Sequence, residues 1–189
     1  MQKHILWFLL FHTFTHVAHS KHERYCLKNE HDKSTPTHEN TAEMGICQPW
    51  SNYSCCSSKT AQYITSPGEL YIRNVLYNQC PHRGTLSNKC KRYFQLDQCF
   101  YLCGSMFLPW LVVTQSANGT KERWRGIPMC SSDCEAWYEA CKDDFTCSAT
   151  WYPSSFGTIN GKPVCKTECR KFKDFHPNAR DFCETIFKG

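Results

Sequence analysis

The chain has no hydrophobic run long enough to cross a membrane. Its most continuous apolar stretch, Ile5–Phe11, is far shorter than the roughly 20 residues that a transmembrane helix needs. The stretch follows a lysine and precedes Ala18-His19-Ser20, which places small residues at the −3 and −1 positions of a cleavage site. We therefore predict that residues 1–20 are a secretory signal peptide and that residues 21–189 form one domain without a transmembrane segment.

Signatures of common enzyme classes are also absent. The sequence contains no Gly-x-Ser-x-Gly elbow, His-Glu-x-x-His pair, Walker loop or Gly-x-Gly-x-x-Gly turn. Five of the nine histidines lie in the predicted signal peptide or just after it, and the other four, His31, His38, His82 and His176, are scattered over segments that we expect to be polar loops. A Cys-His nucleophile would need a free thiol, and nearly all thiols of an exported chain should be oxidised. We predict that the protein is not an enzyme and needs no cofactor.

Basic charge is not concentrated anywhere along the chain. The net charge of +5 is spread without a basic run, and the aromatic residues are not interleaved with it. We therefore expect no nucleic-acid partner, and we interpret the charge as ordinary solubility.

Cysteine is unusually abundant. The chain has 15 cysteines, and all of them lie beyond the predicted signal peptide. This density indicates a disulfide framework in a secreted, extracellular protein. Zinc is the competing interpretation, because the chain has three Cys-x3-Cys pairs, at 99 and 103, 130 and 134, and 165 and 169. No Cys-x2-Cys pair supports it. An odd count leaves at least one thiol without an intramolecular partner. Two sequons predict glycosylation at Asn52 and Asn118.

Periodicity and turn residues predict an α+β domain, mainly helical with short strands and long loops. Residues 21–60 have no clear period. The expected helices are Ser66–Asn78, a long helix over Ser87–Cys103, Ser132–Asp144, a short turn over Cys165–Arg170, and Ala179–Phe187. The segment between the two long helices is read as a short buried stretch, Phe107–Val113, followed by a loop over Thr114–Gly126, and Trp151–Gly161 is read as a second loop.

The long helix places an acid beside an aromatic ring. Asp97 and Tyr101 are one turn apart, with Cys90 and Phe94 further down the same face, while Cys99 and Cys103 lie almost opposite. A carboxylate next to a flat ring suits a planar, hydrogen-bonding ligand. The alternative is a solvated Asp beside a packed Tyr. Aromatic residues in expected loops, either pocket walls or covers for a small core, are Trp50, Trp110, Trp124, Trp151, Tyr152 and Phe156.

The cysteine spacing resembles that of the folate receptor family, which includes the avian riboflavin-binding proteins. The resemblance covers Cys26 to Phe187, nearly the whole mature chain. The segments that carry it are CQPWSNYSCC from Cys47, FQLDQCFYLC from Phe94, and CSSDCEAWYEACKDDFTCSATW from Cys130. The resemblance implies the folate receptor type of fold.

The family's disulfide pattern implies seven bonds in this chain. They are Cys26–Cys55, Cys47–Cys99, Cys56–Cys103, Cys80–Cys169, Cys90–Cys141, Cys134–Cys183 and Cys147–Cys165. The family's eighth bond joins the position of Cys130 to a C-terminal segment that this sequence lacks, so Cys130 is expected to be the unpaired thiol. The hydrophobic tail of the membrane-attached members is lacking too, and we expect either a soluble protein or an incomplete chain.

The resemblance also assigns ligand-binding roles. In the family the ligand ring lies between two aromatic side chains, whose positions here are Tyr101 and Phe187. Asp97 matches the acid that folate receptors use. Of their Trp-Arg-x-x-Arg motif only Arg123 remains, with Trp124 beside it as a substitute. Two tryptophans after Trp151 are replaced, which leaves Tyr152 and Phe156 as pocket walls.

We therefore expect an extracellular, monomeric vitamin-binding protein, for transport or uptake, either secreted or held at the external face of the plasma membrane. Folate or another pterin is favoured slightly over riboflavin, because the carboxylate of Asp97 can accept the N–H groups of a pterin edge. The alternative is a module that recognises a cell-surface protein, as in the family's egg-surface member, with no vitamin ligand.

Overall fold

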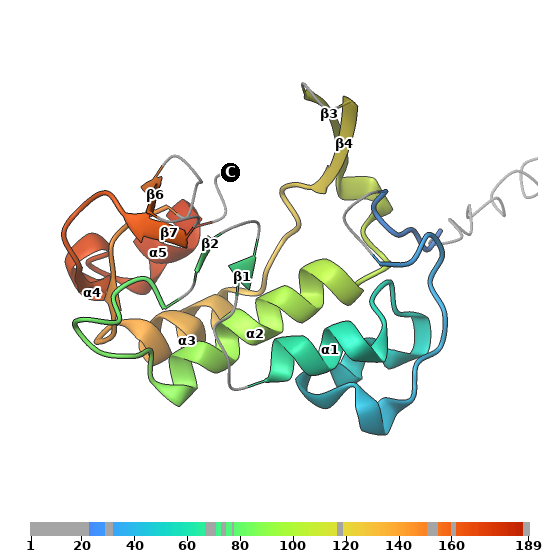
Figure 1. Cartoon of the computed structure of the whole chain (residues 1–189), viewed down its shortest axis with the longest axis horizontal. Helices are drawn as coiled ribbons and strands as arrows, with labels where there is room; N and C mark the ends of the chain where they lie inside the picture. Colours follow the sequence, from blue (N-terminus) through green and yellow to red (C-terminus); the bar gives the residue numbers. More distant parts are fainter. Residues whose placement is uncertain are drawn as a thin grey trace, which may run out of the picture.

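Helix α2 runs through the middle of the molecule, with α1, η2 and α3 packed along it (Figure 1). The structure is a computed structural model that describes residues 23–28, 32–66, 71–72, 75–76, 78–116, 119–150, 155–159 and 162–186. The predicted signal peptide lies outside these residues. Within them, none of the helices combines the length and the apolar character needed to cross a membrane.

Helix α2, Asn88–Cys103, begins and ends within one residue of the long helix predicted from the sequence. The Ser87 hydroxyl accepts the N–H of Cys90 and donates to Asp144 at 2.7 Å, so the cap also ties the helix start to the segment after α3. At the other end, Phe107 folds back over Phe100 with ring centroids 4.4 Å apart. A Cβ on Gly104 would lie 2.2 Å from the Phe107 ring, so this return requires glycine.

Two 3₁₀ helices and helix α1 pack on one side of α2, and they begin within residues 21–60, where the sequence shows no clear period. They are η1 (Thr41–Glu43), η2 (Gly45–Tyr53) and α1 (Ser58–Thr65). Their small core consists of Met44, Ala61 and Ile64 around buried cystines. Because 3₁₀ turns bury few side chains, the part of the molecule formed by η1, η2 and α1 depends on disulfides for its order.

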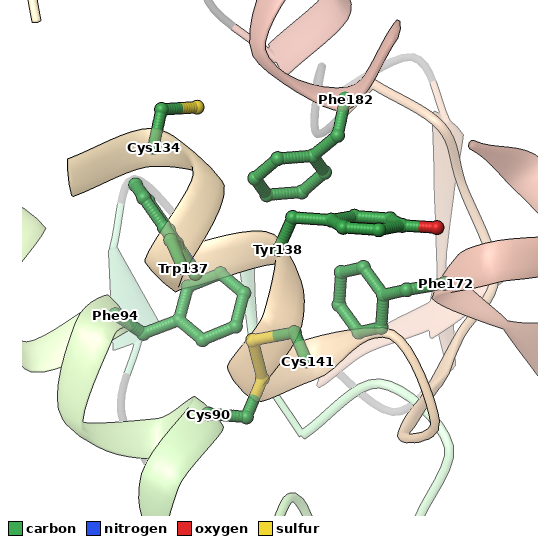
Figure 2. Close-up of a cluster of buried hydrophobic side chains, with 8 residues drawn as sticks. All are labelled: Cys90, Phe94, Cys134, Trp137, Tyr138, Cys141, Phe172 and Phe182. Carbon is green, nitrogen blue, oxygen red and sulfur yellow. A yellow bond between two sulfur atoms is a disulfide. The ribbon is translucent and has the colours of Figure 1, made fainter. Parts of the chain in front are cut away.

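Helix α3 covers the other side of α2, and α5 packs on α3. Helix α3 spans Ser131–Cys141, α4 spans Phe172–Phe175 and α5 spans Ala179–Ile186. Four α3 side chains are buried, and they are the four that the sequence placed on one face: Cys134, Trp137, Tyr138 and Cys141. Figure 2 shows Trp137 between Phe94 of α2 and Phe182 of α5, whose rings meet it edge-on at 5.4 and 5.8 Å. This aromatic cluster is the largest core of the molecule.

The described strands form four two-stranded antiparallel sheets, and three of these replace predicted helix or loop. The pairs are β1 (Tyr71–Ile72) with β2 (Val75–Leu76), β3 (Leu111–Ser116) with β4 (Gly119–Trp124), β5 (Phe145–Thr146) with β8 (Arg170–Lys171), and β6 (Phe156–Ile159) with β7 (Lys162–Cys165). A third 3₁₀ helix, η3, spans Leu108–Trp110 just before β3.

Four secondary-structure predictions are therefore wrong, and one of them is the short helical turn over Cys165–Arg170, where the structure has the end of β7, a bend and the start of β8. The Ser66–Asn78 helix is replaced by the end of α1 and by β1 and β2, where β-branched and aromatic residues favour strands. The loops predicted over Thr114–Gly126 and Trp151–Gly161 both contain hairpin strands. The β3–β4 hairpin extends away from the helices (Figure 1), so most of it has no buried face and no alternating pattern marks it as strand.

His176 is also misplaced by the sequence interpretation. We expected it on a polar loop, but its ring is almost completely buried, edge-on to Phe182. Its Nδ1 lies 2.9 Å from the Asp181 carboxylate, and its carbonyl accepts the Tyr138 hydroxyl at 2.8 Å. His176 is thus a core residue with satisfied polar groups.

Seven disulfides link the elements, and they join the same seven pairs that the family resemblance implies. Five of the six cysteines in the Cys-x3-Cys pairs belong to these bonds and are not available to bind zinc. Cys130 is the described cysteine without a disulfide partner, and it is exposed.

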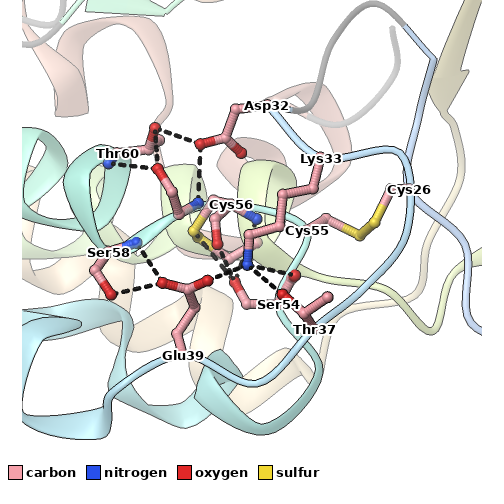
Figure 3. A network of polar contacts seen from close by, with 12 residues as sticks. Cys26, Asp32, Lys33, Thr37, Glu39, Ser54, Cys55, Cys56, Ser58 and Thr60 are labelled. Carbon is pink, nitrogen blue, oxygen red and sulfur yellow. Dashed lines mark hydrogen bonds and ion pairs between the residues drawn. A yellow bond between two sulfur atoms is a disulfide. The ribbon is translucent and has the colours of Figure 1, made fainter.

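A polar network attaches the N-terminal segment to the start of α1. Figure 3 shows the Glu39 carboxylate between the Lys33 ammonium and the backbone N–H and hydroxyl of Ser58. Asp32 accepts the N–H of Ser57 and the Thr60 hydroxyl, both at 2.8 Å. Burial opposes ionisation of Glu39, but these donors outweigh it and hold the pKa of the carboxyl below its ordinary value. Two acids therefore complete the helix N-terminus in place of apolar packing.

We predict that Gly104→Ala destabilises the protein by about 1–3 kcal/mol, the usual cost of forcing an extra methyl into a packed site. The added Cβ would meet both the Phe107 ring and the Phe100 carbonyl oxygen, the latter at 2.5 Å. Urea unfolding followed by tryptophan fluorescence measures the effect. Gly157→Ala is the matched control, because its Cβ would meet nothing closer than 3.6 Å. Equal stabilities of the two variants would contradict the prediction.

Candidate functional site

The acid and the ring of the candidate ligand site lie on the half-buried face of α2. Asp97 and Tyr101 are one helical turn apart, and each is partly exposed and engaged in contacts within the protein. Further down the same face, Cys90 and Phe94 are fully buried against α3 and α4. The face therefore continues from the core into a partly open region, where the Asp97 carboxylate lies near the Tyr101 ring, whose hydroxyl oxygen is buried.

Gln98 is a residue of this region that the sequence interpretation missed. Its side chain is 1% exposed, and its Nε2 makes no hydrogen bond within the described part of the chain. On the helix it projects about 60° from Tyr101, on the side away from Asp97, so a buried amide flanks the Tyr101 side of the pair. Its signal in the sequence was weak, because a glutamine in a polar helix segment is normally solvated.

The opposite side of α2 is fastened to the scaffold. Cys99 is bonded to Cys47 in η2, and Cys103 is bonded to Cys56 just before α1. The side-chain amide of Gln95 donates to the Ile64 carbonyl at 2.9 Å, at the end of α1. These links limit rotation of α2 and thus hold the Asp97 face in one orientation.

Strand β4 places Arg123 and Trp124 on opposite faces of the hairpin. Trp124 is 8% exposed, and its ring packs edge-on against Tyr25 and Phe107, with centroids 6.4 and 5.8 Å away. Arg123 is exposed and pairs with Val112 across the hairpin. Trp124 therefore forms part of the packing at the base of the hairpin, and Arg123 points away from that packing.

The buried acid at this base is Glu122. Its carboxylate oxygens both lie 2.8 Å from the Tyr25 hydroxyl, and one accepts the Lys28 N–H at 2.8 Å. Burial opposes ionisation of Glu122, but these hydrogen bonds and the Lys28 charge outweigh it, so the pKa of the carboxyl lies below 4.5. Burial and the neighbouring Glu122 raise the pKa of the Tyr25 hydroxyl above 10. Glu122 thus joins the hairpin to the N-terminal segment.

Of the remaining predicted ligand residues, Phe156 alone lies within the described part of the chain. Phe156 is buried in the C-terminal part, where it packs with the cystine sulfurs of Cys80, Cys147 and Cys169. Trp151, Tyr152 and Phe187 lie outside the described residues, so the second ring of the sandwich stays a prediction. Of the two predicted glycosylation sites, Asn52 is exposed and Asn118 also lies outside.

Comparison with known proteins gives independent evidence of the family. Residues 25–189 match the folate receptor family. This chain belongs to that family. Folate receptor gamma from Homo sapiens is 31% identical over 166 residues, which cover 86% of this chain and 64% of that protein. The chain thus spans less than two thirds of that receptor's length.

Two further family members show the same level of similarity. Riboflavin-binding protein from Dromaius novaehollandiae is 29% identical over 175 residues, covering 92% of this chain and 69% of that protein. Folate receptor alpha from Homo sapiens is 30% identical over 178 residues, covering 92% and 66%. All three relatives are named as receptors or binding proteins. Two of them are named for folate and one is named for riboflavin.

We predict that Glu122 contributes to acid sensitivity. Because its folded pKa is depressed, its stabilisation is present above the unfolded pKa near 4.5 and is lost as pH falls through the folded value. The melting temperature of the wild-type protein should therefore fall more steeply from pH 6 to pH 3 than that of Glu122→Gln. Glu135→Gln, which removes an exposed acid of α3, serves as control and should retain the wild-type slope. Parallel slopes for wild type and Glu122→Gln would contradict the assignment.

A second prediction concerns the exposed Cys130 thiol. Iodoacetamide should add one label to the native, unreduced protein, since the other cysteines are in disulfides. Mass spectrometry after digestion locates the label, and Cys130→Ser should take up none. Labelling at any other cysteine would show that a different thiol is free.

Proposed function

We propose that the protein binds a flat heteroaromatic vitamin at the Asp97–Tyr101 face of α2, without chemical turnover. The observation that carries the proposal is the half-buried acid and phenol one turn apart, on a helix whose other faces are held by cystines. Membership of the folate receptor family, with relatives named for folate and for riboflavin, supports a vitamin ligand. The phenol of Tyr101 supplies a stacking surface, and the acid supplies an acceptor.

Within this class a pterin is favoured over a flavin. The pterin edge carries an amino group and a ring N–H, both donors, and a carboxylate accepts two such donors as a charge-assisted pair. A flavin's pyrimidinedione edge shows carbonyl, N–H, carbonyl, so an ionised Asp97 would meet two acceptors. Phe187 is the second ring of the sandwich in this proposal.

The protein acts outside the cell in this proposal. Seven disulfides persist in an oxidising compartment, and residues 1–20 have the pattern of a secretory signal peptide. A secreted, monomeric carrier or a surface-held receptor would each bring the vitamin to a cell.

A second candidate, recognition of a cell-surface protein, is favoured by the placement of two aromatic residues. Trp124 and Phe156, both expected as pocket walls, are more than nine-tenths buried in other contacts. If they do not reach a ligand, Asp97 and Tyr101 have fewer partners around a vitamin, and each lost charged contact costs about 1.5–3 kcal/mol.

Substitution of Asp97 tests the proposal. Folic acid is titrated against intrinsic tryptophan fluorescence, and riboflavin against its own fluorescence. Asp97→Asn should weaken folic acid binding about 10- to 150-fold, the equivalent of one lost charged contact, because an amide cannot accept two donors with a full charge. Riboflavin binding should stay the same or improve.

Two matched variants make the result specific. Asp133→Asn removes an exposed acid of α3 and should leave both titrations unchanged. Tyr101→Phe should keep most of the affinity, and Tyr101→Ala should lose it, if the ring stacks on the ligand. The vitamin proposal fails if neither compound titrates at micromolar concentration, and the preference for a pterin fails if riboflavin alone binds.

A further inference from the structure

Gln98 of α2 has a buried amide whose donor is left unpaired. The side chain is 1% exposed, and no hydrogen bond from its Nε2 is found within the described part of the chain. Most buried side-chain polar groups in proteins have a partner, because a buried donor without one lowers the stability of the fold. A ligand that accepts a hydrogen bond would supply the partner that Gln98 lacks.

A second glutamine of the same helix shows the structural use of such a side chain. The Nε2 of Gln95, which is partly exposed, donates to the Ile64 carbonyl at 2.9 Å and thereby ties α2 to the end of α1. At position 98, a methionine would fill a similar volume without losing any such bond. The amide of Gln98 therefore adds no stability to the folded chain. Residues of this kind are typical of functional sites, where stability is given up for binding.

Gln98 lies beside the two residues of the proposed vitamin site. At 100° per residue, Asp97 and Gln98 project on the two sides of Tyr101, about 40° and 60° from it. Tyr101 follows Asp97 by four residues and Gln98 by three, and both spacings make side chains neighbours on a helix. The Tyr101 ring is thus flanked by a partly exposed acceptor on one side and by a buried donor on the other.

The backbone that carries Gln98 is held in place on both sides. Cys99, the next residue, is bonded to Cys47 in η2. One turn before Gln98, the Phe94 ring packs edge-on against Trp137 with centroids 5.4 Å apart. A ligand would therefore meet a donor whose position is set before binding, which lowers the entropy lost when the hydrogen bond forms.

The edge of a pterin has a group that suits this donor. Its hydrogen-bonding groups run in the order amino, ring N–H and ring carbonyl, which makes two donors followed by an acceptor. Asp97 accepts the two donors in the proposed function, and the carbonyl beside them still needs a donor. An amide N–H is complementary to a carbonyl, and the burial of the Gln98 Nε2 keeps water from competing for it.

We infer that Gln98 is a specificity residue of the proposed vitamin site, with its Nε2 donating to the ring carbonyl next to the N–H that Asp97 accepts. The inference rests on the vitamin function proposed above. A ligand that carries an amino group in place of this carbonyl should bind less well, because two donors would then face each other.

The test uses Gln98→Met, which keeps the length of the side chain and removes the amide. Folic acid is titrated against tryptophan fluorescence, and so is aminopterin, its analogue with an amino group in place of the ring carbonyl. The variant should bind folic acid about tenfold more weakly, as expected for one lost hydrogen bond to a buried carbonyl, and aminopterin equally well or more tightly. Its melting temperature should rise by about 2–4 °C, because an unpaired buried donor is removed.

Gln95→Met is the matched control on the same helix. This variant loses the hydrogen bond to the Ile64 carbonyl, so its melting temperature should fall by about 2–4 °C. Its affinities for folic acid and aminopterin should equal those of the wild type, because Gln95 faces α1 and not the Asp97–Tyr101 face.

Three results would overturn the inference alone. Unchanged folic acid binding by Gln98→Met would mean that the amide does not contact the ligand, and equal losses for folic acid and aminopterin would mean that it does not recognise the carbonyl. A lower melting temperature of this variant would show that the amide supports the fold. If the wild-type protein does not bind folic acid, the proposed pterin function is itself refuted, and the inference with it.

Discussion

Three disulfides from one helix govern the rest of the structure. Helix α2 is bonded through Cys90, Cys99 and Cys103 to α3, to η2 and to the turn just before α1, and the bonded partners are separated by 51, 52 and 47 positions in the sequence. In the chain-entropy description, each loop of this length restricts the unfolded chain by about 3–5 kcal/mol. The restriction matters most on the η2 side, where Met44, Ala61 and Ile64 form a small core. The cross-links there replace burial as the main source of order.

The contacts that stabilise α2 also fix the position of the proposed ligand-binding residues. Phe94 packs between Trp137 of α3 and Phe172 of α4, and Asp97 and Tyr101 continue that face one and two turns further along. A ligand that pairs with Asp97 would therefore meet a carboxylate whose position is already determined by cystines and aromatic packing. Preorganisation of this kind lowers the entropy lost on binding.

Sequence reasoning succeeded where a periodic face meets a core. Helix α3 was predicted because its buried residues repeat at helical spacing. The adjacent Trp137 and Tyr138 lie between Cys134 and Cys141, which are both in disulfides. The β3–β4 hairpin was missed because most of its side chains are exposed, so no alternation appears. His176 was missed for another reason. Its burial depends on Phe182 and Asp181, which come from a later helix, and no local pattern records that contact.

The candidate site shows the same division. The spacing of Asp97 and Tyr101 follows from the helical period, and the family resemblance added their expected role. The surroundings of Trp124 and Phe156 depend on how the hairpin and the cystines pack in three dimensions, so neither periodicity nor resemblance could supply them. Gln98 is a residue that sequence reasoning did not select at all, because only its observed burial distinguishes it from a solvated glutamine.

The connectivity of the cystines has a consequence for biosynthesis. All the cysteines lie in described segments, and of the seven bonds only Cys147–Cys165 joins cysteines that follow each other in the chain. Cys47 must wait for Cys99 while Cys55 and Cys56 emerge in between. A chain that enters an oxidising lumen from its N-terminus therefore meets wrong partners before right ones. Its maturation should depend on disulfide exchange, a process of seconds to hours, and hence on an isomerase in the compartment where it is made.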